Sequence, residues 1–207
     1  MKQKIYKLAS ILLTLALVLS TCVCAIGTAS AATEATYYVS PDGVDTADGL
    51  TVATPVATVD KAVNLALAAG CVKGDTVYVK VIHVPDKVNV WTTASNNTIT
   101  AHEFTLDVSS YGDKAQISDG AETHFNGPTN ISNIKFGWGG WKGPNLNAND
   151  VVIGKGVETV IAEFNINLAN ANKAYNKDVN LTLKSPIKRP FYLGGDWAGP
   201  IYNGNIN

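Results

Sequence analysis

The apolar positions just after residue 58 follow a helical period. They recur at intervals of three and four residues and form one stripe along a helix: Val59, Ala62, Val63, Ala66 and Leu67. Thr58 precedes the stripe as a candidate N-cap, and Asp60 lies in the first turn. Gly70 follows the last apolar position, as is common at helix ends. The pattern predicts a short helix over residues 58–69, whose stripe must rest on a larger apolar surface.

Most other segments of the chain carry the pattern of short strands. Runs of β-branched, aromatic and alternating apolar residues are separated by clusters of Gly, Asn, Asp and Pro. The predicted strands are residues 36–40, 75–82, 97–100, 103–108, 115–117, 130–136, 151–153, 157–166, 179–183 and 191–193. Asn-Gly hairpin signals occur at 126–127 and 203–204, but neither lies between matched strands. Repeated short strands with irregular turns therefore favour an all-β solenoid over a meander of hairpins.

The first 31 residues have a different pattern, that of an export signal. Three lysines and no acidic residue occupy the first seven positions, followed by an apolar run over 11–26 and small residues over 27–32. The apolar run is shorter than the ~20 residues of a transmembrane helix. We expect cleavage after Ala31 or Ala32, and hence a protein that is secreted or held at the cell surface.

A second interpretation of this segment is a lipoprotein signal. Leu19-Ser20-Thr21-Cys22 resembles a lipoprotein box, in which the cysteine becomes the acylated N-terminus. Threonine before the cysteine fits that pattern poorly. The plain signal peptide is therefore the preferred interpretation, with no membrane attachment after cleavage.

Composition agrees with an extracellular β-rich protein. Removing the three signal lysines from 16 basic residues leaves 13 against 17 acidic residues, a net charge of −4. This balance gives no electrostatic footprint for nucleic acid. Charged residues make up 16% of the chain, below the ~25% of typical soluble domains, and 15 of the 19 Asn follow residue 100. Residues 32–207 suit one domain, which we expect to be a monomer.

Cys71 is the only cysteine that remains after the signal is removed, so an internal disulfide is excluded. Its setting among alanine, glycine and valine favours a buried, inert thiol over a nucleophile.

The N-terminal part of the predicted domain resembles a known family. The matching runs are Tyr-Tyr-Val-Ser-Pro-Asp-Gly-Val-Asp at 37–45, Asp-Gly-Leu-Thr at 48–51, Thr-Pro-Val-Ala-Thr-Val-Asp-Lys-Ala-Val at 54–63 and Gly-Asp-Thr-Val-Tyr-Val at 74–79. In this order they resemble the entry segment of right-handed parallel β-helix proteins of the pectate-lyase-like superfamily. The resemblance is informative about fold and says little about activity.

The resemblance implies an architecture. The chain would be an all-β, right-handed parallel β-helix in which the helix at 58–69 caps the open end of the solenoid, protecting unpaired strand edges. Residues 32–74 would form the entry strand, turn loop and cap, and residues 75–207 the rungs. The last residues, 201–207, have the pattern of a new rung, so we expect a truncated chain.

Three aspartates in the turn-rich loop are candidate metal ligands. Asp42, Asp45 and Asp48 lie within seven residues, and carboxylate and carbonyl oxygens at such spacing can hold Ca²⁺. The spacing is not that of an EF-hand. The alternative, which we prefer, is that these side chains make Asx-turns and no cofactor is bound.

Three tryptophans on glycine-rich segments are the candidate ligand-binding residues. Trp138, Trp141 and Trp197 could each present a flat apolar face to a sugar ring, with Asp196 available to bond hydroxyls. The alternative is that the rings fold back onto the solenoid, since Trp is usually largely buried.

A catalytic cluster is harder to find. The resemblance implies lyases that use Lys or Arg beside Ca²⁺-bound carboxylates, and hydrolases that use clustered Asp. Lys184, Lys188 and Arg189 form a basic group near Asp178, but the segment has the composition of a solvated loop. The three histidines, His83, His102 and His124, have no metal-ligand spacing and are predicted to be ordinary surface or turn residues.

No catalytic residue can be carried over from the family. We therefore expect a non-catalytic extracellular protein that contacts polysaccharide or another surface ligand. A polysaccharide lyase or glycoside hydrolase of the same fold is the alternative, and an inert fragment of a longer surface protein is a third.

Overall fold

The computed structural model describes residues 34–92, 98–100, 104–118, 124–136, 145–147, 150–159, 164–166, 180–185 and 191–193. The chain divides into two compact units, residues 1–31 and 32–207, and every described residue belongs to the second. The predicted export signal lies outside the described residues.

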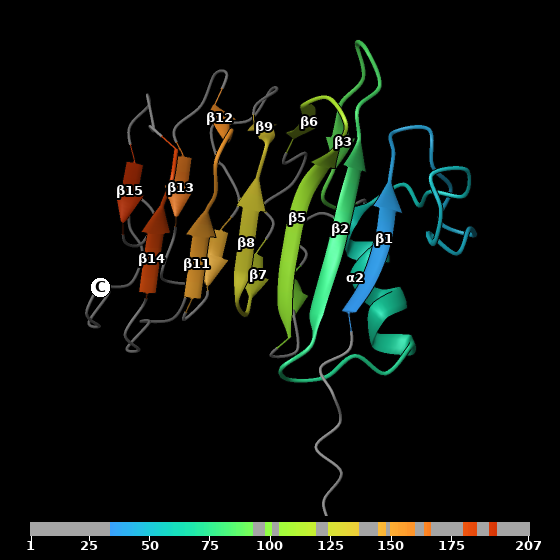
Figure 1. The fold of residues 1–207 in the computed structure, drawn as a ribbon, viewed down its shortest axis with the longest axis horizontal. Helices are drawn as coiled ribbons and strands as arrows, with labels where there is room; N and C mark the ends of the chain where they lie inside the picture. The colour runs from blue at the N-terminus through green and yellow to red at the C-terminus, as the bar shows by residue number, and fades with distance from the viewer. Residues whose placement is uncertain are drawn as a thin grey trace, which may run out of the picture. The chain divides into compact units, whose positions relative to one another are not determined.

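The described secondary structure is mostly β, with one short helix (Figure 1). The elements are β1 (Glu34–Val39), α2 (Val59–Ala68), β2 (Thr76–Ile82), β3 (Asn89–Val90), β4 (Thr98–Thr100), β5 (Thr105–Tyr111), β6 (Ala115–Ser118), β7 (His124–Asn126), β8 (Thr129–Ser132), β9 (Ile134–Phe136), β10 (Asn145–Asn147), β11 (Asp150–Ile153), β12 (Glu158–Thr159), β13 (Phe164–Ile166), β14 (Asn180–Leu183) and β15 (Phe191–Leu193). The predicted mostly β class is confirmed.

All described strand pairs are parallel. Sheet A has the order β1-β2-β5-β8-β11-β14, sheet B the order β3-β6-β9-β12, and sheet C the order β4-β7-β10, while β13 pairs with β15. From β2 onward, neighbours within sheets A, B and C are three strands apart along the chain. The chain therefore visits the three sheets in turn, and each new strand lies beside the one formed three strands earlier. Figure 1 shows the strands of sheet A side by side from β1 to β14.

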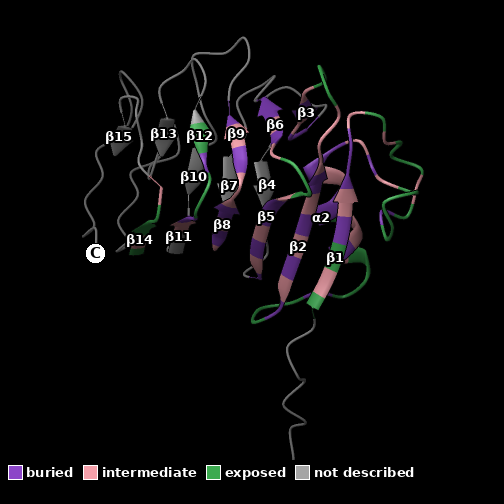
Figure 2. Ribbon diagram, turned by 45° about the horizontal axis from the view of Figure 1, so that its top comes forward, coloured by how far each residue is buried: buried purple, intermediate pink, exposed green. Residues whose placement is uncertain are grey.

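Alternation along the strands of sheet A builds the core. Val77, Val79 and Val81 of β2 are fully buried, and the residues between them are half-buried. β5 continues the pattern with Leu106 and Val108, as Figure 2 shows by the alternating colours of β1, β2 and β5. A strand exposes opposite faces at successive residues, so these valines and leucines share one inner face.

Helix α2 forms as the sequence predicts. The Thr58 hydroxyl accepts a hydrogen bond from the backbone N–H of Lys61 at 3.1 Å, which satisfies one of the free donors of the first turn. Gly70 follows the helix with φ of +90°, a conformation that glycine adopts without strain. The apolar stripe packs against β1 and β2, and four of its predicted residues are buried: Val59, Ala62, Val63 and Ala66.

Two predicted strands are each divided in the structure. Residues 130–136 were expected to form one strand, but Asn133, with φ of +51°, separates β8 in sheet A from β9 in sheet B. The physical reason lies in Ile131 and Ile134, which are both fully buried although they are three residues apart. A single flat strand would point them to opposite faces, whereas a corner between them turns both inward.

The second of these predicted strands is the one expected at 157–166. Its described parts belong to two strands, β12, which pairs with β9, and β13, which pairs with β15. The sequence analysis did not predict three strands of two or three residues each, β3, β7 and β10. Each of these strands contains asparagine, which is depleted in strands, so the local composition did not indicate a strand.

Every described connection from a strand of sheet A to the next strand in sheet B contains a residue with left-handed backbone conformation. The four residues are Asp86 (φ 60°), Gly112 (φ 74°), Asn133 (φ 51°) and Gly156 (φ 76°). Glycine, asparagine and aspartate are the residue types that tolerate this region. The corners between the two sheets therefore depend on residue types that the sequence supplies at each passage.

Serine hydroxyls join successive corners. Ser110 donates to the carbonyl of Asn133 at 2.5 Å and accepts from the N–H of Ala115 at 2.8 Å. Ser185 donates to the carbonyl of Gly154 at 2.6 Å and accepts from the N–H of Val157 at 3.1 Å. Backbone groups that the turns leave without ladder partners are thus satisfied by side chains.

The buried side chains on the inner face of sheet A lead to a stability prediction. We expect Ile131→Ala to lower the free energy of unfolding by about 2–5 kcal/mol, because the fully buried side chain leaves a cavity. Asn130→Ala, at the adjacent half-buried position of the same strand, should cost about 0.5 kcal/mol or less. Urea unfolding followed by circular dichroism measures both. Equal losses for the two variants would contradict the assigned inner face.

The Asn133 corner gives a second prediction. We expect Asn133→Val to destabilise the protein by about 1–2 kcal/mol, because a β-branched residue is strained at φ of +51°. Asn133→Gly removes the same amide but fits the conformation, so it should be much less damaging. The comparison uses the same urea titration, and a glycine variant as unstable as the valine variant would place the effect in the lost amide instead of the backbone.

Candidate functional site

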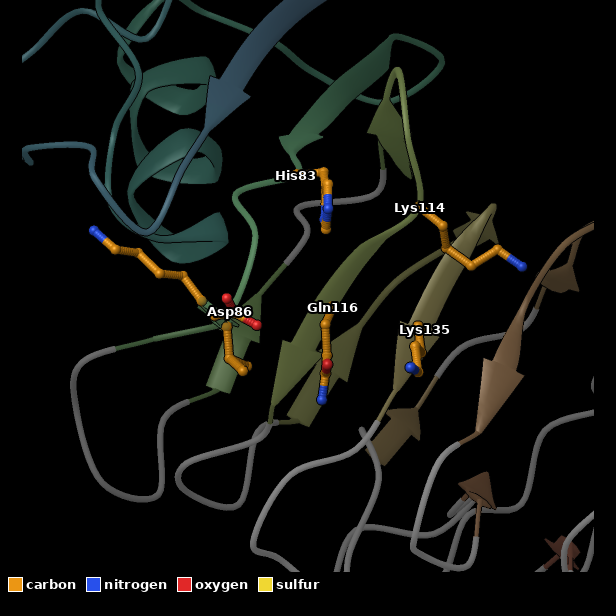
Figure 3. Close-up of a pocket in the computed structure, with 7 residues that line it drawn as sticks. His83, Asp86, Lys114, Gln116 and Lys135 are labelled. Carbon is orange, nitrogen blue, oxygen red and sulfur yellow. The ribbon is translucent and has the colours of Figure 1, made fainter.

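A pocket of about 350 Å³ lies on the outer face of sheet B (Figure 3). It is lined by His83, Asp86, Lys87, Val88, Lys114, Gln116 and Lys135. Ile117 and Phe136, the strand neighbours of Gln116 and Lys135, are buried in the core. Alternation therefore places Gln116 and Lys135 on the opposite, solvent-facing side of the sheet.

A tight turn between β2 and β3 positions one end of the pocket. The backbone N–H of Lys87 donates to the carbonyl of Val84 at 3.2 Å, closing a four-residue turn. Pro85 occupies the second position, and Asp86 has φ of 60° at the third. A proline followed by a residue with positive φ is the signature of a type II turn. The turn places Asp86 and Lys87 beside the start of β3.

The strands of sheet B contribute the floor of the pocket. Gln116 of β6 is in register with Lys135 of β9, and Lys135 is in register with Glu158 of β12. Figure 3 shows Gln116 and Lys135 on neighbouring strands, with His83 and Lys114 nearby. Lys114, just before β6, forms an ion pair with Glu158 at 2.5 Å, and so its side chain reaches past β9 to β12.

The lining carries more positive than negative charge. The lining includes three lysines, Lys87, Lys114 and Lys135, and one carboxylate, that of Asp86. Lys87 also forms an ion pair with Asp42, in which each side chain is about half exposed. Such exposed pairs contribute only about 0–1 kcal/mol, so Lys87 can exchange partners.

A second surface lies on the outer face of sheet A and is called here the tyrosine face, consisting of Tyr38, Tyr78, Lys80, Ser109 and Tyr111. Tyr38 and Tyr111 contact each other edge to face, with ring centroids 5.4 Å apart, and Tyr111 remains 49% exposed. The ammonium of Lys80 lies 5.5 Å from the Tyr78 ring centroid and donates to the Ser109 hydroxyl at 2.7 Å. Aromatic rings and polar groups thus lie side by side on the outer face of a parallel sheet.

The Tyr78 hydroxyl is held at the edge of this face. It donates to a carboxylate oxygen of Glu34 at 3.3 Å. The negative charge of Glu34 raises the pKa of Tyr78, because ionising the phenol would place two negative charges side by side. Tyr78 therefore remains a neutral hydrogen-bonding group at physiological pH.

The residues of the sequence-predicted tryptophan site, Trp138, Trp141, Trp197 and Asp196, all lie outside the described residues. Their role in ligand binding stays a prediction.

The carboxylates of the predicted calcium loop each have a partner of their own. Asp48 accepts from the Leu50 N–H at 3.0 Å and from the Thr54 hydroxyl at 2.6 Å. The hydrogen bond from Thr54, and then that from Leu50, lowers the pKa of Asp48. Asp45 accepts from the Ala57 N–H at 3.1 Å. The Asp48–Leu50 contact has the two-residue spacing of an Asx-turn, whereas the Asp45–Ala57 contact joins positions twelve residues apart.

Asp42, the third aspartate of that loop, has a partner outside the loop. It forms the ion pair with Lys87 at the pocket. Within the part of the chain that the structure describes, no group of three or more His, Cys, Asp or Glu side chains is arranged to hold a metal ion. Binding of Ca²⁺ by Asp42, Asp45 and Asp48 stays a prediction.

The remaining candidates are placed as follows. Lys184 follows β14 and is exposed, while Lys188, Arg189 and Asp178 lie outside the described residues. His83, predicted to be an ordinary turn residue, follows β2 and lines the pocket.

Cys71 is buried, as the sequence predicts. Burial raises the pKa of its thiol, and the negative charge of Asp75 raises it further. The thiol is therefore protonated at neutral pH, which agrees with an inert cysteine.

Sequence reasoning did not find the lysines of the pocket. A local signal exists for Lys135, which stands between the apolar residues Ile134 and Phe136 and is thereby assigned to an outer face. The sequence gives no local indication that Lys135 lies near Lys87 and Lys114, because their proximity depends on pairing between strands that are three apart along the chain.

Comparison with known protein families, curated proteins and solved structures finds no match to this chain. Among the described residues, the helix present is too short to cross a membrane.

The hydrogen bonds of Asp48 predict a pH dependence. Its folded pKa lies below the ordinary value of 3.8, so its contribution to stability is present above that value and is lost as pH falls through the folded pKa. We expect Asp48→Asn to lower stability at neutral pH and to differ less from the unmodified protein in strong acid. Urea midpoints measured from neutral pH downward test this.

Asp113→Asn is the control for the Asp48 variant. Asp113 is an exposed carboxylate that accepts no hydrogen bond from any residue the structure describes. A pH profile shared by the two variants would show that the Thr54 and Leu50 contacts do not act on Asp48.

Proposed function

We propose that this chain is a non-catalytic, secreted or cell-surface protein that binds polysaccharide on the outside of a right-handed parallel β-helix. The proposal joins three inferences, concerning the fold, the location and the ligand. Each rests on separate observations.

The solenoid is supported by the strand order. Neighbours in sheets A, B and C are three strands apart, and all of their pairs are parallel. A chain that coils once for every three strands would produce this order. The left-handed corners and the inward aliphatic rows fit the same geometry, and the right-handed sense follows the strong preference of parallel crossovers.

Secretion is supported by the sequence of the first 31 residues. A basic start, an apolar run and a small-residue cleavage segment are the parts of an export signal in their usual order. The lone, buried Cys71 places no demand on the redox state of the compartment.

The tyrosine face is the observation that supports polysaccharide as the ligand. A sugar ring offers one apolar face and a rim of hydroxyls, so it needs an aromatic surface beside hydrogen-bonding groups. Tyr111 supplies the exposed ring, which Tyr38 contacts edge to face. Lys80 supplies a polar group on the adjacent strand β2, and the buried Ser109 hydroxyl accepts a hydrogen bond from its ammonium. Trp138, Trp141, Trp197 and Asp196 are proposed from the sequence to contribute to polysaccharide binding.

A test of the proposal compares Tyr111→Ala with Tyr111→Phe. Removing the ring should weaken polysaccharide binding by about twofold to tenfold, whereas phenylalanine keeps the stacking surface and should retain most of the affinity. Affinity electrophoresis against a panel of neutral and acidic polysaccharides measures the change. Leu50→Ala, another exposed apolar side chain, is the control for general surface hydrophobicity.

Two results would contradict the proposal. No retardation by any polysaccharide would remove the binding role. Release of unsaturated uronate or of reducing ends during the assay would identify the protein as a lyase or hydrolase and overturn the non-catalytic assignment.

A further inference from the structure

We propose that the pocket on sheet B binds an oxyanion, a carboxylate or sulfate group, with Lys135 as its central contact. This site is separate from the tyrosine face and does not depend on the proposed polysaccharide binding there. The ligand class follows from the charges that the fold brings together.

Three lysines reach the pocket from three separate segments of the chain. Lys87 comes from the turn between β2 and β3, Lys114 from the corner before β6, and Lys135 from the middle of β9. Like charges that line one pocket repel one another. An anion between them would relieve this repulsion.

The charge of Lys135 is not neutralised by its neighbours. Glu158 is its register partner on β12, yet the carboxylate of Glu158 pairs with Lys114. Gln116, the register partner on β6, carries no charge. Among the residues that the structure describes, Lys135 forms no ion pair. Its ammonium is therefore available to an incoming anion.

Among the described residues, the other two lysines form ion pairs with carboxylates outside the lining. The Lys87–Asp42 pair is about half exposed on both sides, whereas in the Lys114–Glu158 pair the lysine is 27% exposed and the glutamate 58% exposed. Partly exposed pairs of this kind contribute little and can exchange partners. An oxyanion bound at Lys135 can thus draw Lys114 and Lys87 toward itself, and Glu158 acts as an internal competitor for Lys114.

The remaining lining residues define the shape of the ligand. Gln116 and His83 can donate hydrogen bonds to oxygens, and Val88 is the one apolar residue of the lining. The pocket volume of about 350 Å³ is at the small end of ligand sites. It admits one charged group with the ring or short chain that carries it, and Asp86 disfavours a second negative charge at the turn.

The experiment measures binding of four probes to the full secreted chain: inorganic sulfate, dextran sulfate, carboxymethyl-dextran and uncharged dextran. We expect Lys135→Met to weaken binding of the charged probes about tenfold or more, because it removes a charged hydrogen-bond donor at constant side-chain length. Lys73→Met removes the same charge at an exposed position after α2 and should change binding by about twofold or less. Thermal melting confirms that each variant is folded.

A second variant should act in the opposite direction. Glu158→Gln releases Lys114 from its ion pair, so it should tighten anion binding severalfold. Glu34→Gln changes the net charge equally but lies on β1 of sheet A, and with inorganic sulfate as the probe it should have little effect. A structural role for the Lys114–Glu158 pair alone would not produce tighter binding.

The outcomes separate the sources of the anion. Binding of inorganic sulfate that depends on Lys135 assigns the pocket to small anions, and binding of the charged dextrans alone assigns it to acidic polymers. Equal losses in Lys135→Met and Lys73→Met, or no gain in Glu158→Gln, would overturn the proposal. Uncharged dextran reports on the tyrosine face, so failure of one site is distinguishable from failure of the other.

Discussion

The structure depends on one row of buried side chains that crosses sheet A. Tyr37, Val79, Val108, Ile131 and Ile153 are in register on five successive strands and are almost completely buried. Parallel strands cannot be joined by tight hairpins, so each step along this row requires the chain to leave the sheet and return. A register slip of one residue would turn the whole row outward, which is why burial fixes the register so strongly. Sheets B and C are the route by which the chain returns.

The same constraint places the outer faces. Because successive residues alternate, fixing the inner row also fixes which residues point to solvent, and the register aligns them from strand to strand. Lys80 and Ser109 meet on sheet A in this way, and Gln116 and Lys135 meet on sheet B. Both candidate surfaces are therefore consequences of the core. Their chemistry differs because sheet A presents tyrosines and sheet B presents lysines.

Local sequence features predicted much of the fold and little of the site. The helix after Thr58 and the strand at β2 were predicted because their periodicity and capping residues act within a few positions. The division of residues 130–136 at Asn133 was missed because an asparagine corner differs from a strand residue only in its backbone conformation. The pocket was missed because Lys87, Lys114 and Lys135 become neighbours only through pairing across long stretches of chain. The predicted tryptophan site lies outside the described residues.

The register of sheet A is most directly tested by nuclear Overhauser contacts in the isotope-labelled protein. We expect backbone contacts between Val79 and Val108 and between Val108 and Ile131, the parallel partners three strands apart. Contacts that instead join consecutive strands in antiparallel register, such as β5 with β6, would contradict the parallel strand order and the two surfaces that depend on it.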